Sequence, residues 1–199
     1  MPIVCRAAPV LVLMLAAFAA PGARADTPSG TAADRPFVVP QRDVDVVYAV
    51  PTPDNGPALS QRMRFAAATR QQRVDPPGSG LYMLTDYAAR TMTVVQPAQH
   101  LATTIPAPGA PLSPDGRAAG GAWSRGATAT IAGLSCTDWQ TADASGNPSE
   151  VCFTDDGVLL RAAQGGRIML EARTVSLLPQ PAAVFVVPDG FQRRRAPAP

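Results

Sequence analysis

The chain has 199 residues, of which 46% are hydrophobic and 16% are charged. Its formal net charge of +2 comes from Arg6 and Arg24, so the 174 residues after position 25 (199 − 25) are formally neutral. A neutral surface exerts no long-range attraction on nucleic acids or anionic lipids, which argues against a nucleic-acid partner.

The first 25 residues have the pattern of a cleaved secretory signal peptide. A short basic start precedes the apolar run at 7–20, and Ala23-Arg24-Ala25 supplies the small residues of an A-x-A cleavage site. The apolar run is shorter than the roughly 20 residues that span a bilayer. The sequence therefore predicts a signal peptide at 1–25, a periplasmic protein without a transmembrane segment in its mature chain, and a disordered linker at 26–35.

The first half of the mature chain predicts five strands. In residues 43–50, alternation places Val44, Val46 and Tyr48 on one face of a half-buried strand. A turn rich in Pro and Gly follows, with Asn55-Gly56 suited to positive φ. The other strands expected in this half span residues 61–75, 81–87, 91–96 and 100–105.

The second half begins with a loop at 106–122 that is rich in Pro, Gly and Ala. A loop of this length is either mobile or functional, and its composition favours mobility. Residues 184–187 and Phe191 form a last apolar anchor, and a disordered tail is expected at 193–199. Five further strands are expected at 127–133, 134–141, 151–154, 158–163 and 167–178, with a tight turn at Asp156-Gly157.

Two cysteines, Cys136 and Cys152, lie beyond the predicted signal peptide, and Cys5 lies within it. Because exported compartments are oxidising, an even pair of cysteines favours a disulfide. The bond would close a loop of about 15 residues and stabilise the fold by about 3 kcal/mol. The alternative is a pair of metal ligands, which lacks partners because His100 is the only histidine. We therefore expect a disulfide and no metal or cofactor.

These elements predict a mainly β protein of about ten short strands and few short helices, arranged as one domain at 36–192. The pattern favours an antiparallel sheet or a partial barrel.

Three short motifs resemble a known group of proteins. Ile131-Ala-Gly-Leu-Ser-Cys136, Trp139 and Phe185-Val-Val-Pro-Asp-Gly-Phe191 resemble the uncharacterised bacterial periplasmic proteins with a LolA/LppX-like fold. The resemblance implies a strongly curved, half-barrel antiparallel sheet around an apolar cavity, and relatives of that fold bind lipids. The present chain departs from the pattern because it has no clear helices to plug the open side.

A set of apolar side chains has the character of an adaptable pocket, because methionine is unbranched and polarizable. The same residues would also fill an ordinary core, and composition does not separate the two interpretations. The candidate pocket residues are Val46, Tyr48, Met63, Phe65, Met83, Met92 and Val94, with Met169 as a further methionine.

The polar motifs favour structural roles. His100 has no recognisable nucleophile or orienting carboxylate and is expected on the solvent face of a strand. Asp155-Asp156 is expected in a turn, and Asp54-Asn55-Gly56 lacks the spaced acidic ligands of a calcium loop. Trp139 is expected to pack near the disulfide, and Arg193–Arg195 to be solvated.

The sequence therefore predicts a non-enzymatic exported protein that binds an apolar ligand, a lipid or an acyl chain. The alternative is an envelope interaction or scaffold module that meets a protein partner through a sheet edge or through the loop at 106–122.

Overall fold

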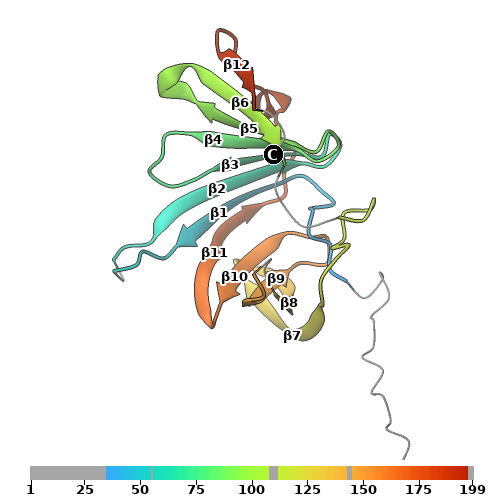
Figure 1. Ribbon diagram of the computed structural model, residues 1–199. Coiled ribbons are helices and arrows are strands. Elements are labelled where there is room, and N and C mark those ends of the chain that lie inside the picture. Colours follow the sequence, from blue (N-terminus) through green and yellow to red (C-terminus); the bar gives the residue numbers. More distant parts are fainter. Residues whose placement is uncertain (1–34, 55, 108–111, 143–144, 197–199) are drawn as a thin grey trace, which may run out of the picture.

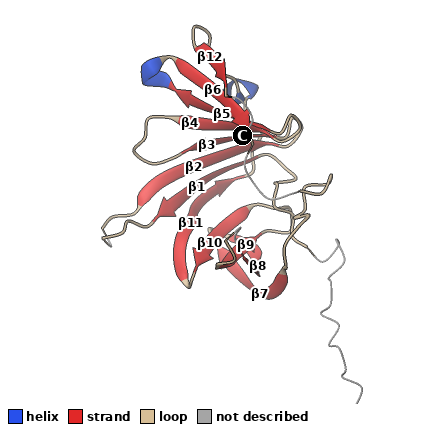
Figure 2. Cartoon of the chain, in the orientation of Figure 1, coloured by secondary structure: helices blue, strands red, loops and turns tan. Residues whose placement is uncertain are grey.

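The computed structural model describes residues 35–54, 56–107, 112–142 and 145–196. Within these ranges the chain is mainly β, with short 3-10 turns as its helical elements (Figure 2). The predicted signal peptide and the predicted linker up to residue 34 lie outside the described residues.

The described strands form one open sheet in the order β12-β6-β5-β4-β3-β2-β1-β11-β10-β9-β8-β7 (Figure 1). The sheet consists of two antiparallel meanders, β1 to β6 and β7 to β11, which are joined by pairing of β1 with β11. The strands are β1 Val44–Val50, β2 Leu59–Ala66, β3 Gln71–Asp75, β4 Tyr82–Asp86, β5 Thr91–Gln96, β6 Leu101–Pro106, β7 Ser124–Ile131, β8 Leu134–Ala142, β9 Pro148–Phe153, β10 Leu159–Gln164, β11 Arg167–Ser176 and β12 Gln192–Arg195.

The second meander curls. The long strand β11 bends between the two parts of the sheet (Figure 1), and Cα atoms of β7 come within 8 Å of β11 although three strands separate them in the sheet order. The mainly β prediction is confirmed, and the described residues form twelve strands where about ten were expected.

One additional strand arises because the single strand expected at 61–75 is two strands, β2 and β3, joined by a turn at 67–70. The turn closes with a hydrogen bond from Arg70 N to Ala67 O at 3.2 Å, and Arg70 has a φ of 52°. Positive φ is uncommon for a residue other than Gly, Asn or Asp, so the sequence carries no turn signal there.

The other additional strand is β12, in a region expected to be a disordered tail from residue 193. Gln192–Arg195 pair in parallel with β6, and Gln192 N donates to His100 O at 2.7 Å. His100 itself lies in the turn before β6, with a φ of 48°, and not within the strand as expected. Neither residue belongs to an apolar alternation, so the side-chain pattern does not predict this pairing.

The predicted disulfide is confirmed. Cys136 on β8 and Cys152 on β9 are bonded, with their Cα atoms 5.5 Å apart. Both are buried in a hydrophobic cluster. Trp139 is also buried but lies on the opposite face of β8, because it is three positions after Cys136 and side chains alternate along a strand.

The main cluster joins the two meanders. It combines side chains of β1 and β2 with those of the curled strands β8 and β10 and with Val39 of the segment before β1. That segment is fixed by backbone hydrogen bonds from Val38 and Val39 to Gly116 O and from Gln41 N to Asp156 O. Part of the long loop expected to be mobile therefore packs against the N-terminal segment.

A second, smaller cluster contains Tyr82, Leu84, Val95 and Ala102 of β4, β5 and β6. It is covered by residues 182–191, which we call the C-terminal strap; this segment contains η3 (Ala182–Phe185) and the apolar side chains of Val187 and Phe191. The expected apolar anchor near the C-terminus corresponds to this strap.

Candidate functional site

The strand register places all seven candidate pocket residues on one face of the sheet. Directly paired residues share a face, and residues two apart along a strand also share it. The pairs Val46–Met63, Met63–Val74, Val74–Met83 and Met83–Val94 form one continuous row across β1 to β5. Tyr48, Phe65 and Met92 lie on the same face by the same two rules.

Four of the seven belong to the main core. Val46, Tyr48, Met63 and Phe65 are at most 5% exposed and pack in the cluster that joins the two meanders. Tyr48 donates its hydroxyl to Leu159 O at 2.8 Å, and burial raises the pKa of this phenol. These four side chains therefore fill the space between the two parts of the sheet.

The other three lie on the same face beyond the core, Met83 and Val94 in the row described above and Met92 in the row beside it. Met83, Met92 and Val94 are half-buried and are not members of the main cluster. Ile105 of β6, paired with Met92, is also half-buried and extends the apolar surface by one strand. We call Met83, Met92, Val94 and Ile105 the open apolar row, because the core ends beside them and the face continues.

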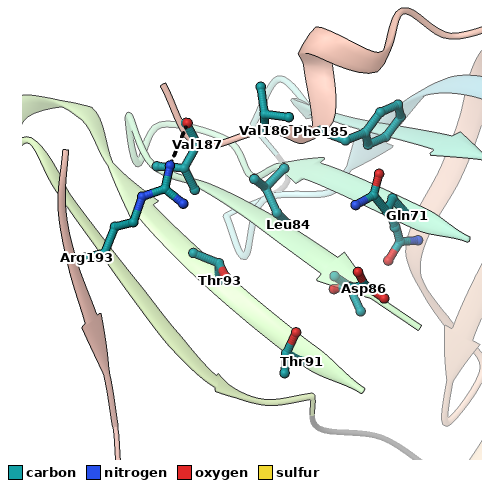
Figure 3. A pocket seen from close by; sticks show the side chains of 11 residues that line it. Gln71, Leu84, Asp86, Thr91, Thr93, Phe185, Val186, Val187 and Arg193 are labelled. Carbon is teal, nitrogen blue, oxygen red and sulfur yellow. Dashed lines mark hydrogen bonds between the residues drawn. The ribbon is translucent and has the colours of Figure 1, made fainter. Parts of the chain in front are cut away.

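The opposite face of β3 to β5 carries a groove of about 330 Å³ beneath the C-terminal strap. Figure 3 shows Leu84 and Thr93 on its floor, with Phe185, Val186 and Val187 of the strap along one side. Val186 is 54% exposed, so the strap wall of this groove is partly open to solvent.

Two charged residues line the groove from opposite ends (Figure 3). Arg193 donates to Val187 O at 3.2 Å, and Asp86 accepts from Ala89 N at 2.7 Å. Both partners are backbone groups, so these contacts do not neutralise either charge. The groove thus has a positive end and a negative end, and between them apolar side chains of the strap and Leu84 alternate with the polar residues Thr91 and Thr93.

An ion-pair cluster anchors the strap beside this groove. Arg73 binds Asp75 with its closest N–O distance at 2.7 Å, donates to Val184 O at 3.3 Å and stacks on the ring of Tyr82. Arg64 adds a second contact to Asp75 at 3.1 Å. Partial burial raises the pKa of Asp75, but hydrogen bonds from Arg73 and Arg64 outweigh it and leave the pKa below its ordinary value.

Two further depressions lie on the second meander. One, of about 550 Å³, is lined by β8, β9, β10 and the turn before β11, and it contains Arg161. Arg161 contacts Asp138 at 2.9 Å and Glu150 at 3.7 Å, so its charge is neutralised within the protein. The other, of about 250 Å³, lies on the face of β8 that carries Trp139. None of the seven candidate pocket residues lines the cavities described here.

The polar motifs are dispersed. His100 is exposed and contacts the ring of Phe191, and Asp156 lies in the expected turn, where it pairs with Arg42 at 3.8 Å. Arg193–Arg195 form β12, and the motif at 54–56 lies partly outside the described residues because it includes Asn55. Among the described residues, no group of three or more His, Cys, Asp or Glu side chains is placed to hold a metal ion.

Sequence reasoning missed the strap groove. The apolar patterns around Leu84 and Phe185 predict ordinary core residues, and the sequence around Arg193 predicts a solvated tail. The one available signal was residues 81–84, Leu-Tyr-Met-Leu, in which both strand faces are apolar. A strand that is apolar on both faces must be covered on both, or left partly open on one.

None of the helices in the described ranges is long and apolar enough to cross a membrane.

Comparison with known proteins identifies the fold but not a family. No protein-family model matches the chain, and no curated protein matches it significantly. An uncharacterized conserved protein from Thermus thermophilus superposes with a TM-score of 0.56 and 12% identity over 78% of this chain and 91% of that one. PNGF-II superposes with a TM-score of 0.50 and 12% identity over 78% of this chain, which spans only 31% of that protein. At this identity both likenesses concern the fold alone.

Proposed function

We propose that the protein is an exported, non-enzymatic protein that binds an apolar ligand, a lipid or an acyl chain, on the open apolar row. The observation that carries the proposal is that the sheet face which forms the core in β1 and β2 continues in β4 to β6 with half-buried methionine, valine and isoleucine side chains. The ligand would lie along this face of the sheet and extend the core outward.

The chemistry of the row suits such a ligand. Met83 and Met92 supply flexible, polarizable side chains that adapt to chains of different length. On the same face Thr85 is paired with Met92 and Thr103 with Val94, so each apolar side chain on this face of β5 has a threonine as one cross-strand neighbour. An acyl chain removes apolar area from water at about 25 cal/mol per Å², and this term needs no specific polar contact.

The location and shape belong to the same proposal. The signal-peptide pattern at 1–25 supports export to the periplasm. The resemblance of Ile131–Cys136, Trp139 and Phe185–Phe191 to LolA/LppX-like proteins supports a curved half-barrel in which the apolar face is the concave one. In this chain the deep part of that face is filled by Phe65 and its neighbours, so the ligand would occupy the outer part.

The proposal is tested by extracting the purified protein with organic solvent and examining the extract by mass spectrometry. We expect a bound lipid or fatty acid, together with saturable binding of a fluorescent fatty acid. The double variant Met83→Ser/Met92→Ser should lower the affinity for the probe by at least about tenfold, since two thioethers covered by the ligand contribute a few kcal/mol. Met169→Ser is the matched control, because Met169 is 47% exposed on β11 and outside the row. Equal affinity in the two variants would refute this site.

A protein-interaction module is the second candidate, and β7 is the feature that favours it. β7 is an edge of the sheet, and nearly all of its residues are exposed. The other edge, β12, carries three consecutive arginines, and such charges protect an edge from pairing. A photo-crosslinker at Thr128 should then capture one partner in the envelope, while a crosslinker at Arg194 should not. Lipid recovery without any adduct at Thr128 would exclude this candidate.

A further inference from the structure

The cavity of about 250 Å³ on the face of β8 that carries Trp139 is lined by three arginines. Arg35 comes from the segment before β1, Arg117 from the loop before β7, and Arg125 from β7 itself. Phe37 and Trp139 contribute aromatic walls. Two parts of the chain that are distant in sequence, the segment before β1 and the stretch at 117–125, therefore bring cationic side chains to one small cavity.

Arg117 is held rigidly in this arrangement. Its Nε lies 3.2 Å from Asp115, and its Nη1 donates to Arg35 O at 2.6 Å. Its guanidinium carbon lies 3.7 Å from the centroid of the Phe37 ring. A cation stacked on a ring and bound at two nitrogen atoms has lost most of its rotamer freedom, so little further entropy is lost when a ligand binds it.

Arg35 and Arg125 are not neutralised. In the part of the chain that the structure describes, neither forms an ion pair with a carboxylate. Arg35 donates to Ala118 O at 3.4 Å and Arg125 to Thr137 Oγ1 at 3.5 Å, both at the long end of hydrogen-bond geometry. Each guanidinium has five N–H donors, so most of them are left for another acceptor.

The charge around the cavity is net positive. Asp155 is the one carboxylate among the residues that line it, and Asp115 pairs with Arg117, so three guanidinium groups face two carboxylates. This contrasts with the larger depression at Arg161, where Asp138 and Glu150 oppose a single arginine. Guanidinium forks match the oxygen spacing of carboxylate and phosphate groups, and like charges brought together are stabilised by an anion between them.

We propose that this cavity binds the anionic group of a small ligand, a phosphate or a carboxylate, through Arg35, Arg117 and Arg125, with Trp139 forming the wall. Its volume lies below the roughly 300–1,000 Å³ of drug-sized sites, which restricts the ligand to a small molecule. The bound anion would connect the N-terminal segment, the loop at 112–118 and β7. The site is independent of the open apolar row, which lies on the β1 to β6 meander.

The experiment titrates the purified protein with inorganic phosphate and, separately, with benzoate, at constant ionic strength with chloride as the reference anion. Trp123→Phe leaves Trp139 as the only tryptophan, so its fluorescence reports on this cavity. We expect saturable binding of at least one of the two anions by calorimetry, with a matching change in Trp139 fluorescence. The titration that saturates at the lower anion concentration shows whether the cavity prefers a phosphate or a carboxylate group.

Arg35→Gln and Arg125→Gln should each weaken binding by about tenfold or more, because each removes a charge-assisted hydrogen bond, which is roughly twice as strong as a neutral one. Arg173→Gln on β11 removes one exposed positive charge elsewhere and should bind normally. Raising the chloride concentration should weaken binding in the unsubstituted protein, which tests the charge dependence without any variant. The proposal is overturned if neither phosphate nor benzoate binds more tightly than chloride. It is also overturned if Arg35→Gln, Arg125→Gln and Arg173→Gln bind the anion with the same affinity.

Discussion

The two halves of the first meander, β1–β2 and β4–β6, bury opposite faces of the sheet. At β1 and β2 the buried face carries Val46 and Phe65, and it is covered by the curled second meander. At β4 to β6 the buried face carries Tyr82 and Val95, and it is covered by the C-terminal strap. The change of face occurs at β3, where every residue is half-buried.

This difference explains why an apolar row is left open. Because neighbouring strands share a register, the core row at Val46 and Met63 must continue across β4 and β5 as Met83 and Val94. The second meander curls toward β11 and does not extend over β5 and β6, while the strap covers the other side. A core that ends in the middle of a continuous sheet face leaves a partly covered apolar surface, which is the basis of the proposed ligand site.

The largest expected effect is on the main core. Phe65→Ala removes a fully buried ring and should lower the free energy of unfolding by about 4 kcal/mol. Leu84→Ala in the smaller cluster should cost about 2 kcal/mol, because Leu84 is already 9% exposed and borders the strap groove. Urea unfolding measures both, and a larger loss for Leu84→Ala would reverse the ranking of the two clusters.

Removal of the disulfide should be next in size. Cys136→Ala/Cys152→Ala should lower the free energy of unfolding by about 3 kcal/mol, mainly because the unfolded chain gains freedom. Reduction of the unsubstituted protein provides the control and should give a similar loss. A change of less than about 1 kcal/mol in both experiments would show that the curled meander is held by packing alone.

The contact between the turn at 155–157 and the N-terminal segment is tested at Gly157. Gly157 has a φ of 84°, and an added Cβ would lie 2.7 Å from Val39 O and 2.9 Å from Phe37 Cβ. Gly157→Ala should therefore cost about 2–3 kcal/mol, as strain and displacement of the segment add together. Gly166→Ala is the matched control, because φ is 77° and no atom lies within 4 Å of the added Cβ. Its cost should be only about 1 kcal/mol. Equal losses of stability in Gly157→Ala and Gly166→Ala would mean that the N-terminal segment moves away from the added methyl group without a measurable cost in free energy.

The smallest effect concerns pH and the anchoring of the strap. Since the folded-state pKa of Asp75 lies below its ordinary value, its contribution to stability is present above about pH 4 and is lost as the pH falls through the lower folded pKa. Asp75→Asn should therefore make the free energy of unfolding fall less steeply below about pH 4. Urea unfolding at a series of pH values measures this slope. An unchanged slope would show that the pairs with Arg73 and Arg64 do not persist in solution.

The sequence determined the class of fold and much of the local structure. Alternation at 43–50 identified β1 and its buried face, the Asp156-Gly157 pair identified a turn, and cysteine usage identified the bond between Cys136 and Cys152. These features are encoded by neighbouring residues or by composition, so they can be inferred from a single chain.

Only the tertiary structure decided how the elements combine. The turn at Arg70 and the pairing of β12 with β6 depend on positive φ and on backbone hydrogen bonds, which leave no mark in the side-chain pattern. The pairing of β1 with β11 joins the second meander to the first, and side chains of the second meander then pack against Val46 and Phe65 of β1 and β2. Met63 and Met83 have similar sequence surroundings, yet Met63 is buried in the core and Met83 is half-buried. The difference arises because burial depends on which distant segment covers each part of the sheet face.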